Sequence, residues 1–121
     1  MVTREAVAEV RLRDGVAVID LVGDVNAAAE HAFDAAWEQA AALRPDAVVL
    51  NFEQAGYINS TGIALVVGLL ARARARSLPV RAFGLTPHYR EIFEITRLAD
   101  FLAINPDEDS AVRGAEGTTD D

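Results

Sequence analysis

The chain has 121 residues, a formal net charge of −8 and no cysteine. A chain of this length supports one hydrophobic core rather than two, and its strong negative charge disfavours binding to nucleic acid or to anionic membranes, because both reward basic surfaces. The lack of cysteine excludes disulfides, thiolate catalysis and cysteine-ligated metal sites.

The N-terminal residues and the longest apolar run indicate where the protein acts. The N-terminus carries mixed charge with no apolar stretch behind it, which is not typical of a signal or transit peptide. The longest apolar run, Ile63 to Ala71, is much shorter than the roughly 20 residues that span a bilayer. We therefore expect a soluble cytoplasmic protein that does not insert into membranes.

The chain begins with the pattern of a β-hairpin. Residues 7–12 alternate apolar and polar side chains, and residues 16–22 form a second, mostly apolar run. Arg13-Asp14-Gly15 separates the two runs and has the composition of a tight turn. The pair is therefore predicted to be antiparallel.

A loop and an alanine-rich helix are predicted next. Residues 23–26 form the loop, and Asp24 or Asn26 is expected to cap a helix that runs to about Leu43. Arg44-Pro45-Asp46 ends this helix, because proline disfavours helical conformation in the residue before it. Three large or apolar residues share the face that the helix should bury: Phe33, Trp37 and Ala40.

A buried strand and a strongly apolar helix occupy the centre of the chain. Residues 47–50 are a β-branched run typical of a strand covered on both faces, and residues 51–58 are predicted as the loop that leaves it. Asn59 or Ser60 is expected to be the N-cap of the helix, which is apolar around most of its circumference and should leave part of that surface exposed. Its last turns contain Arg72, Arg74 and Arg76, which suit the negative end of the helix dipole.

The remaining elements are short. Residues 79–83 predict a fourth strand, and Pro87 fits the first turn of the next helix. Residues 101–104 predict a last strand, and residues 105–107 start a last helix. From Gly114 onwards the chain is small and acidic, so residues 114–121 are predicted to be a disordered tail.

The order of these elements predicts an α/β fold in a single domain, residues 1–113. Two strands are followed by alternating helices and strands, which favours a mixed sheet of four to five strands with about four helices and right-handed crossovers. Functional loops in such sheets gather at the carboxyl ends of the strands. Ser60 lies just beyond one of these ends.

The stretch from Tyr57 to Ile63 is the best candidate for a functional site, because it places two hydroxyls and a glycine between a strand and a helix. The simplest interpretation is a helix N-cap followed by a close-packing glycine, Gly62. A phosphate on Ser60 would be compatible with that structure, since free N–H groups and the helix dipole favour negative charge at a helix N-terminus.

Three segments together resemble a STAS domain of the bacterial anti-sigma factor antagonist type: Gly23-Asp24-Val25-Asn26, Val48-Val49-Leu50-Asn51-Phe52 and Tyr57-Ile58-Asn59-Ser60-Thr61-Gly62-Ile63. Residues 95–102 resemble the segment that follows a strand and a helix in the same order in this family, so the resemblance covers roughly residues 5 to 113. It implies that a partner anti-sigma factor, itself a serine kinase, phosphorylates Ser60. It also implies that the unmodified protein binds this kinase and so frees a sigma factor, and that phosphorylation reverses the binding.

Two positions depart from the family pattern. Directly before the serine, the family commonly has aspartate, whereas this chain has Asn59. At the end of the buried strand, the family again commonly has aspartate, whereas this chain has Asn51. Thr61 is the second candidate for the phosphate, because its hydroxyl is expected to bond to the backbone of the first helical turn.

A partner-binding surface is expected at the same place. If the second and third strands are parallel neighbours, the segments that follow them emerge at one edge of the sheet, and one partner can cover both. The residues expected to form this surface are Gly23, Asp24, Asn26, Tyr57, Asn59, Ser60, Thr61, Gly62 and Ile63.

Two other functions remain open. The protein could be a STAS subunit or sensor component of a transporter or stress-signalling assembly that works by docking without phosphorylation. It could also be a small-ligand-binding domain that uses a pocket between Gly23-Asp24 and Ser60. Homodimerisation is left open as well.

Catalysis, metals and cofactors are not expected. His31 and His88 lie on different elements without ligand spacing, and neither a Gly-x-Ser-x-Gly elbow nor a phosphate-binding loop of the Walker type is present. We therefore expect a protein-binding domain that is not an enzyme.

Overall fold

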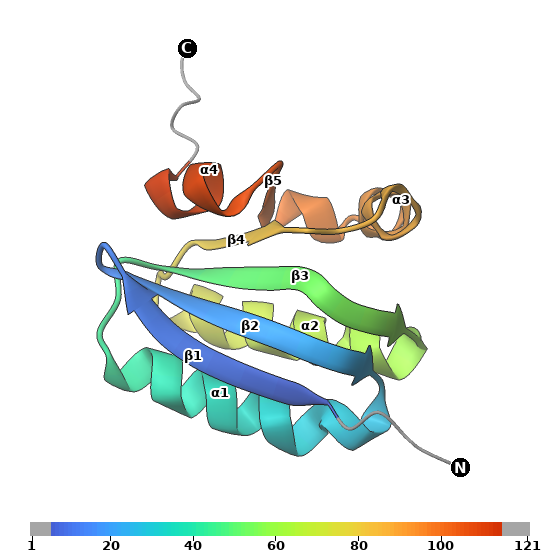
Figure 1. Ribbon diagram of the computed structural model, residues 1–121, viewed down its shortest axis with the longest axis horizontal. Helices are drawn as coiled ribbons and strands as arrows, with labels where there is room; N and C mark the ends of the chain where they lie inside the picture. Colours follow the sequence, from blue (N-terminus) through green and yellow to red (C-terminus); the bar gives the residue numbers. More distant parts are fainter. Residues whose placement is uncertain (1–5, 115–121) are drawn as a thin grey trace.

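The computed structural model describes residues 6–114 and contains a five-stranded sheet in the order β1-β2-β3-β4-β5. β1 is antiparallel to β2, and the other neighbouring strands are parallel. The mixed sheet and the alternating order of strands and helices confirm the predicted single-domain α/β fold (Figure 1). The elements are β1 (Val7–Arg13), β2 (Val16–Val25), η1 (Ala27–Ala29), α1 (Glu30–Ala42), β3 (Ala47–Ile58), α2 (Ser60–Ala75), β4 (Val80–Phe83), α3 (Pro87–Ile95), η2 (Leu98–Asp100), β5 (Ala103–Asn105) and α4 (Glu108–Arg113).

The predicted hairpin is confirmed, and its turn has the expected geometry. Asp14 and Gly15 both have positive φ, 52° and 81°. A two-residue turn with both residues in this region matches the right-handed twist of the flanking strands. The turn therefore sets the register that pairs Arg13 with Val16 and Val7 with Val22.

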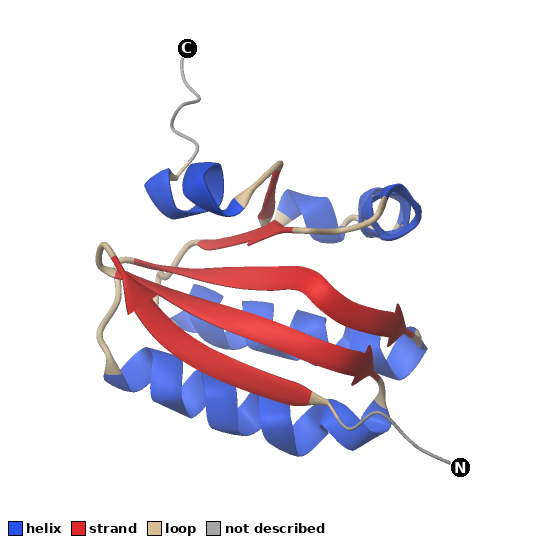
Figure 2. Ribbon diagram, in the orientation of Figure 1, coloured by secondary structure: helices blue, strands red, loops and turns tan. Residues whose placement is uncertain are grey.

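The two faces of the sheet are covered differently. α1 and α2 cover one face, and α4 packs against the other (Figures 1 and 2). Alternate residues of the strands point to the first face, where they form the main core with Phe33, Trp37 and Ala40 of α1, as expected. On the second face, Ala111 and Val112 of α4 contact a smaller apolar cluster from β2, β3 and β4.

The second and third strands are longer than the sequence predicts. β2 continues through Val25 instead of ending at residue 22, and β3 continues through residues 51–58, which were expected to form a loop. The two extensions pair with each other, Gly23 beside Ala55 and Val25 beside Ile58, with register irregularities between the pairs. Each extension supplies the backbone partner that the other needs, and sequence patterns within one segment do not reveal this.

The starts and ends of several elements also differ from expectation. Asn26 is a cap, because its side-chain oxygen accepts a hydrogen bond from the Ala28 N–H at 3.0 Å, but it caps the short η1 turn that precedes α1. Asp24 lies within β2 and caps no helix. The last strand is Ala103–Asn105 rather than residues 101–104, because residues 98–100 form η2. Most of the predicted tail, residues 115–121, lies outside the described residues.

Candidate partner-binding site

The ends of β2 and β3 lie side by side, as the predicted surface requires. Val25 is paired with Ile58, and the Asn59 N–H donates a hydrogen bond to the Val25 carbonyl at 3.2 Å. The segments that follow these two parallel strands therefore emerge together at the carboxyl edge of the sheet. Asn26 and Asn59, which are 33 positions apart in the chain, each follow one of these paired residues.

Asn59 is the N-cap of α2, which resolves the choice between Asn59 and Ser60. Its side-chain oxygen accepts a hydrogen bond from the Gly62 N–H at 2.9 Å, and its backbone is extended. Ser60 is consequently the first helical residue, and it is exposed. Its hydroxyl makes no hydrogen bond to another residue in the range 6–114.

Thr61 shares this exposure. It is the second residue of α2, and no hydrogen bond from its hydroxyl is found in the described part of the chain. The expectation that backbone hydrogen bonding occupies the Thr61 hydroxyl was therefore wrong. Sequence position within the motif, rather than occupancy of the hydroxyl, is what distinguishes Ser60 from Thr61.

Gly62 is required by a close contact between α2 and β2. A Cβ at this position would lie 2.0 Å from the Val25 carbonyl oxygen, far inside the normal contact distance. The interpretation of Gly62 as a close-packing glycine is confirmed by this geometry. Together with the Asn59 cap, the contact fixes where the first turn of α2 lies on the end of the sheet.

Asp24 and Tyr57 join the two strands at this edge. The Asp24 carboxylate accepts a hydrogen bond from the Tyr57 N–H at 3.0 Å, and the Tyr57 side chain itself is 80% exposed. A large aromatic side chain with this exposure is an unusual surface feature and a typical anchor in protein interfaces. The hydroxyl of Tyr89 in α3 accepts a hydrogen bond from the Ile58 N–H at 3.0 Å, a support that the sequence did not reveal.

The predicted surface residues thus fall into two groups. Gly23 and Gly62 are buried and shape the backbone, and Ile63 is partly buried against the core. The remaining residues of the predicted surface are fully or partly exposed: Asp24, Asn26, Tyr57, Asn59, Ser60 and Thr61.

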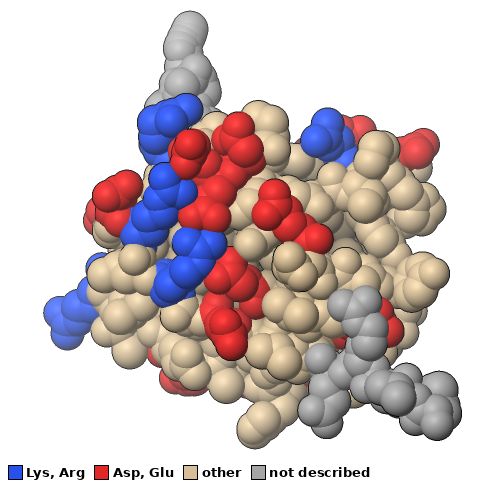
Figure 3. All heavy atoms as spheres, in the orientation of Figure 1, with Lys and Arg blue, Asp and Glu red and all other residues tan. Residues whose placement is uncertain are grey.

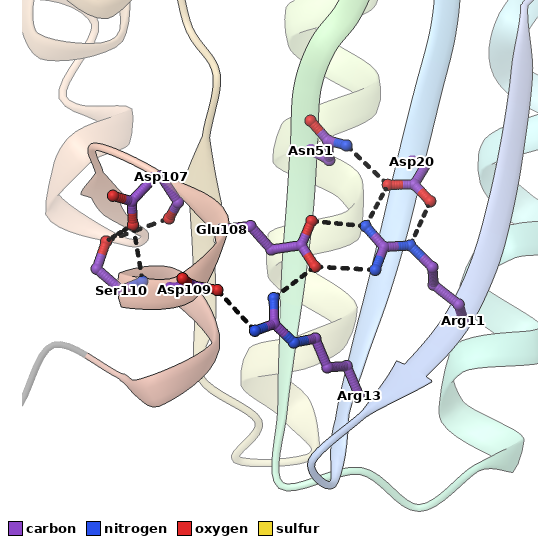
Figure 4. Close-up of polar contacts among 8 residues, drawn as sticks. All are labelled: Arg11, Arg13, Asp20, Asn51, Asp107, Glu108, Asp109 and Ser110. Atoms are coloured by element: carbon purple, nitrogen blue, oxygen red, sulfur yellow. Dashed lines mark hydrogen bonds and ion pairs between the residues drawn. The ribbon is translucent and has the colours of Figure 1, made fainter.

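Asn51 has a structural role that explains its departure from the family pattern. Its side chain is buried and donates a hydrogen bond to the Asp20 carboxylate at 2.7 Å (Figure 4). It also accepts a hydrogen bond from the Glu53 N–H at 2.9 Å. An aspartate here would set a second carboxylate against Asp20, and two like charges at such a distance repel strongly. Asparagine therefore suits this environment better.

Asp20 belongs to a network of ion pairs on the second face of the sheet. Arg11 bonds to both Asp20 and Glu108, and Arg13 bonds to Glu108 and Asp109, with distances of 2.6–3.0 Å. Partial burial opposes ionisation of Asp20, but hydrogen bonds from Arg11 and Asn51 outweigh it and lower the pKa of its carboxyl. Figure 3 shows the resulting intermixed basic and acidic side chains on this face.

The described residues also bear on the other functions considered. Three cavities in this part of the chain, of about 800, 190 and 20 Å³, are lined by residues other than Gly23, Asp24 and Ser60. Within residues 6–114 no cluster of three or more His, Asp or Glu residues could hold a metal ion. No helix in this range combines the length and the apolar character needed to cross a bilayer.

The mixed sheet with helical crossovers places the protein in the class of small α/β domains. More specifically, a family model described as "Mlab, STAS domain" matches residues 8–104. The chain therefore belongs to the STAS domain family, which confirms the family predicted from the sequence.

Known proteins agree with this assignment. The chain is 31% identical over 58 residues to the anti-sigma-B factor antagonist of Staphylococcus aureus strain NCTC 8325, a match that covers 48% of this chain and 54% of that protein. The chain thus spans about half the length of the curated relative that it matches.

Two solved structures share the fold. An anti-sigma factor antagonist from Mycobacterium paratuberculosis has a TM-score of 0.73 and 20% identity, with 89% of this chain and 92% of that chain covered. The Bacillus cell fate determinant SpoIIAA in its phosphorylated form has a TM-score of 0.62 and 21% identity, with coverage of 88% and 97%.

Proposed function

We propose that the protein is an anti-sigma factor antagonist controlled by phosphorylation of Ser60. In this proposal the unmodified protein binds an anti-sigma factor of the serine-kinase type, which frees a sigma factor in the cytoplasm, and phosphorylation of Ser60 releases the kinase. The chain itself catalyses nothing. The observation that carries the proposal is the exposed Ser60 hydroxyl at the first position of α2, which no described residue engages.

The first turn of α2 can accept a phosphate without large rearrangement. Because Asn59 caps the helix, modification of Ser60 removes no capping hydrogen bond. The phosphate would lie at the positive end of the α2 dipole, where anions are stabilised. The fold should therefore persist after phosphorylation.

The expected effect falls on the partner instead. The exposed Tyr57 side chain and the surrounding polar side chains form one surface at the end of β2 and β3. A charge of about −2 brought into a close interface there must be paired or desolvated, which costs binding free energy. Loss of the partner with retention of the fold is the property that a switch needs.

A phosphorylation assay tests the proposal directly. The protein is incubated with ATP and an anti-sigma factor kinase of the same organism, and the modified peptide is identified by mass spectrometry. We expect one phosphate on Ser60, no incorporation in Ser60→Ala, and normal incorporation in Thr61→Val. Phosphate on Thr61 alone, or none at all with a kinase that binds the protein, would contradict the proposal.

Hydrogen exchange locates the partner surface independently. Amides that follow β2 and β3 should become protected on binding, whereas the exposed face of α1 around His31 and Glu38 should not change. Protection confined to α1 would rule out the proposed surface.

Asn59 favours one alternative, a STAS component that docks without being phosphorylated. The family pattern has an acidic residue directly before the serine, and Asn59 is neutral and already used as a cap. This alternative predicts that the partner binds wild type and Ser60→Ala equally and that no phosphate is incorporated. The same assay therefore separates the two functions.

A further inference from the structure

A large apolar pocket lies at the other end of α2, away from Ser60. It has a volume of about 800 Å³ and is formed by the C-terminal half of α2, the start of β4 and the turn that connects α3 to η2. Pockets that bind small molecules typically have volumes of about 300–1,000 Å³. The pocket shares no lining residue with the surface around Ser60.

The pocket is apolar both in its interior and at its rim. Leu70, Val80 and Leu98 line it and are nearly buried, and they belong to the main core of the domain. Val67 and Phe101 also line it but are 46% and 56% exposed. The exposed apolar side chains at the rim and the buried ones inside form a continuous apolar surface. A ligand that covers this surface displaces water from it, which favours binding.

Arg74 supplies an unpaired positive charge at this pocket. Its guanidinium carbon lies 5.6 Å from the centre of the Phe101 ring, and it has no carboxylate partner within residues 6–114. The other arginine of the lining, Arg97, pairs with Asp100 at 2.7 Å. The neighbouring Arg72 on α2 pairs with Asp34, also at 2.7 Å. Arg74 is therefore available to an anion from outside the described chain.

The walls of the pocket follow two helix ends. Ser77 and Arg97 both line the pocket and have positive φ, 58° and 68°. Each comes two residues after the last residue of its helix, Ala75 of α2 or Ile95 of α3, where a left-handed residue commonly ends a helix. The Leu78 N–H donates a hydrogen bond to the Ala73 carbonyl at 2.9 Å, which is part of this helix-ending motif.

We propose that this pocket binds an amphipathic organic anion, with an apolar body and one carboxylate head. The body would lie against Leu70, Val80 and Leu98, and the carboxylate would pair with the Arg74 guanidinium beside Phe101. A charge-assisted pair of this kind provides orientation, and the apolar surface provides most of the affinity. This ligand site goes beyond the proposed switch and does not depend on it.

The site is tested by titrating the protein with decanoate, at concentrations below those at which decanoate forms micelles. Binding is monitored by the chemical shifts of the backbone amides. We expect saturable binding at one site, with the largest shifts on α2 from Val67 to Leu78 and on η2. Arg74→Gln should weaken decanoate binding about tenfold, because one charge-assisted contact is lost. The affinity for decanol, which has the same chain and no charge, should not change.

Two matched variants control for general effects. Arg76→Gln removes a neighbouring arginine that does not line the pocket, so it should bind decanoate as wild type does. Ala71→Trp fills the pocket and should abolish binding, whereas Ala35→Trp places the same side chain on the exposed face of α1 and should not. Circular dichroism checks that each variant is folded.

Several results would overturn the proposal. These are lack of saturable decanoate binding, equal weakening by Arg74→Gln and Arg76→Gln, shifts confined to residues outside the pocket, and occupation of the pocket by a protein segment instead of decanoate. Ser60→Ala should bind decanoate normally. Failure of this site therefore leaves the proposed phosphorylation untouched, and failure of phosphorylation leaves this site untouched.

Discussion

The two ends of α2 are built on opposite plans. At the first turn, contacts made to the backbone determine position: the Asn59 side chain caps the helix, and Gly62 lies directly against the Val25 carbonyl. At the last turns, side chains surround an open apolar pocket, and Arg74 has no partner carboxylate within residues 6–114. A site that must present one hydroxyl at one place needs a fixed backbone, whereas a ligand pocket needs unfilled space between side chains.

The largest effect is expected where the first turn touches β2. Gly62→Ala would place a methyl group 2.0 Å from the Val25 carbonyl oxygen, so α2 or β2 must shift. We expect a loss of about 3 kcal/mol in the free energy of unfolding, measured by urea denaturation.

Gly68→Ala on the same helix is the matched control. A Cβ there meets nothing within 4 Å, so the better helix propensity of alanine should stabilise the protein by about 1 kcal/mol. If both variants lost stability equally, the contrast between a fixed first turn and a freer second half of α2 would be wrong.

A smaller effect is expected from the cap. Asn59→Ala removes the hydrogen bond from the Gly62 N–H and should cost about 1 kcal/mol. Ser60→Ala should change the free energy of unfolding by less than about 0.5 kcal/mol, because Ser60 is not the cap. Thermal melts of the two variants check this order, and a larger loss in Ser60→Ala would reverse the assignment of the cap.

The ion pairs of α4 provide a pH-dependent comparison on the other face of the sheet. Hydrogen bonds from Arg11, and then from Arg13, outweigh partial burial and lower the pKa of Glu108 from 4.5 to about 2. The contribution of Glu108 to stability is therefore full above about pH 4.5 and is lost as the pH falls through about 2.

Glu108→Gln should remove this contribution, which is about 1 kcal/mol for a largely solvated pair. The free energy of unfolding of this variant should therefore fall less steeply than that of wild type as the pH is lowered. Glu91→Gln on the exposed side of α3 serves as the control, and its free energy of unfolding should depend on acid pH as that of wild type does. Urea denaturation at several pH values between 2 and 6 measures this dependence. The same dependence in wild type and Glu108→Gln would contradict the prediction.

The smallest effect on stability is expected from Ser60→Asp. A carboxylate at the first turn of a helix is tolerated, so the melting temperature should change little. Binding to the anti-sigma factor, measured by calorimetry, should nevertheless be lost. A variant that unfolds, or one that binds as well as wild type, would contradict the separation between fold and switch.

Local signals in the sequence were sufficient for much of this structure. The turn at Asp14-Gly15 and Pro87 at the start of α3 depend on neighbouring residues only, and both were predicted. The N-cap of α2 was narrowed to Asn59 or Ser60, and the structure selects Asn59. Gly62 was also recognised as a close-packing residue, because it is a glycine in the first turn of an apolar helix.

Features that depend on distant residues were missed. The extensions of β2 and β3 exist because each pairs with the other, and the bond between Tyr89 and the Ile58 backbone joins residues 31 positions apart. The ion pairs between Arg11 and Glu108 and the pocket beside Arg74 likewise require the folded chain. Periodicity within a segment carries no information about such contacts.

The pairing of Arg11 with Glu108 has a consequence for how the protein is made. The two residues are 97 positions apart. The hairpin is synthesised before α4, and closing so long a loop has an entropy cost that rises with its length. A nascent chain that stops just before α4 already contains all five strands of the described sheet. In that chain the edge strand β1 pairs with β2 and packs against α1, but it lacks the ion pairs to Glu108. Synthesis of α4, rather than assembly of the sheet, is the event that secures β1.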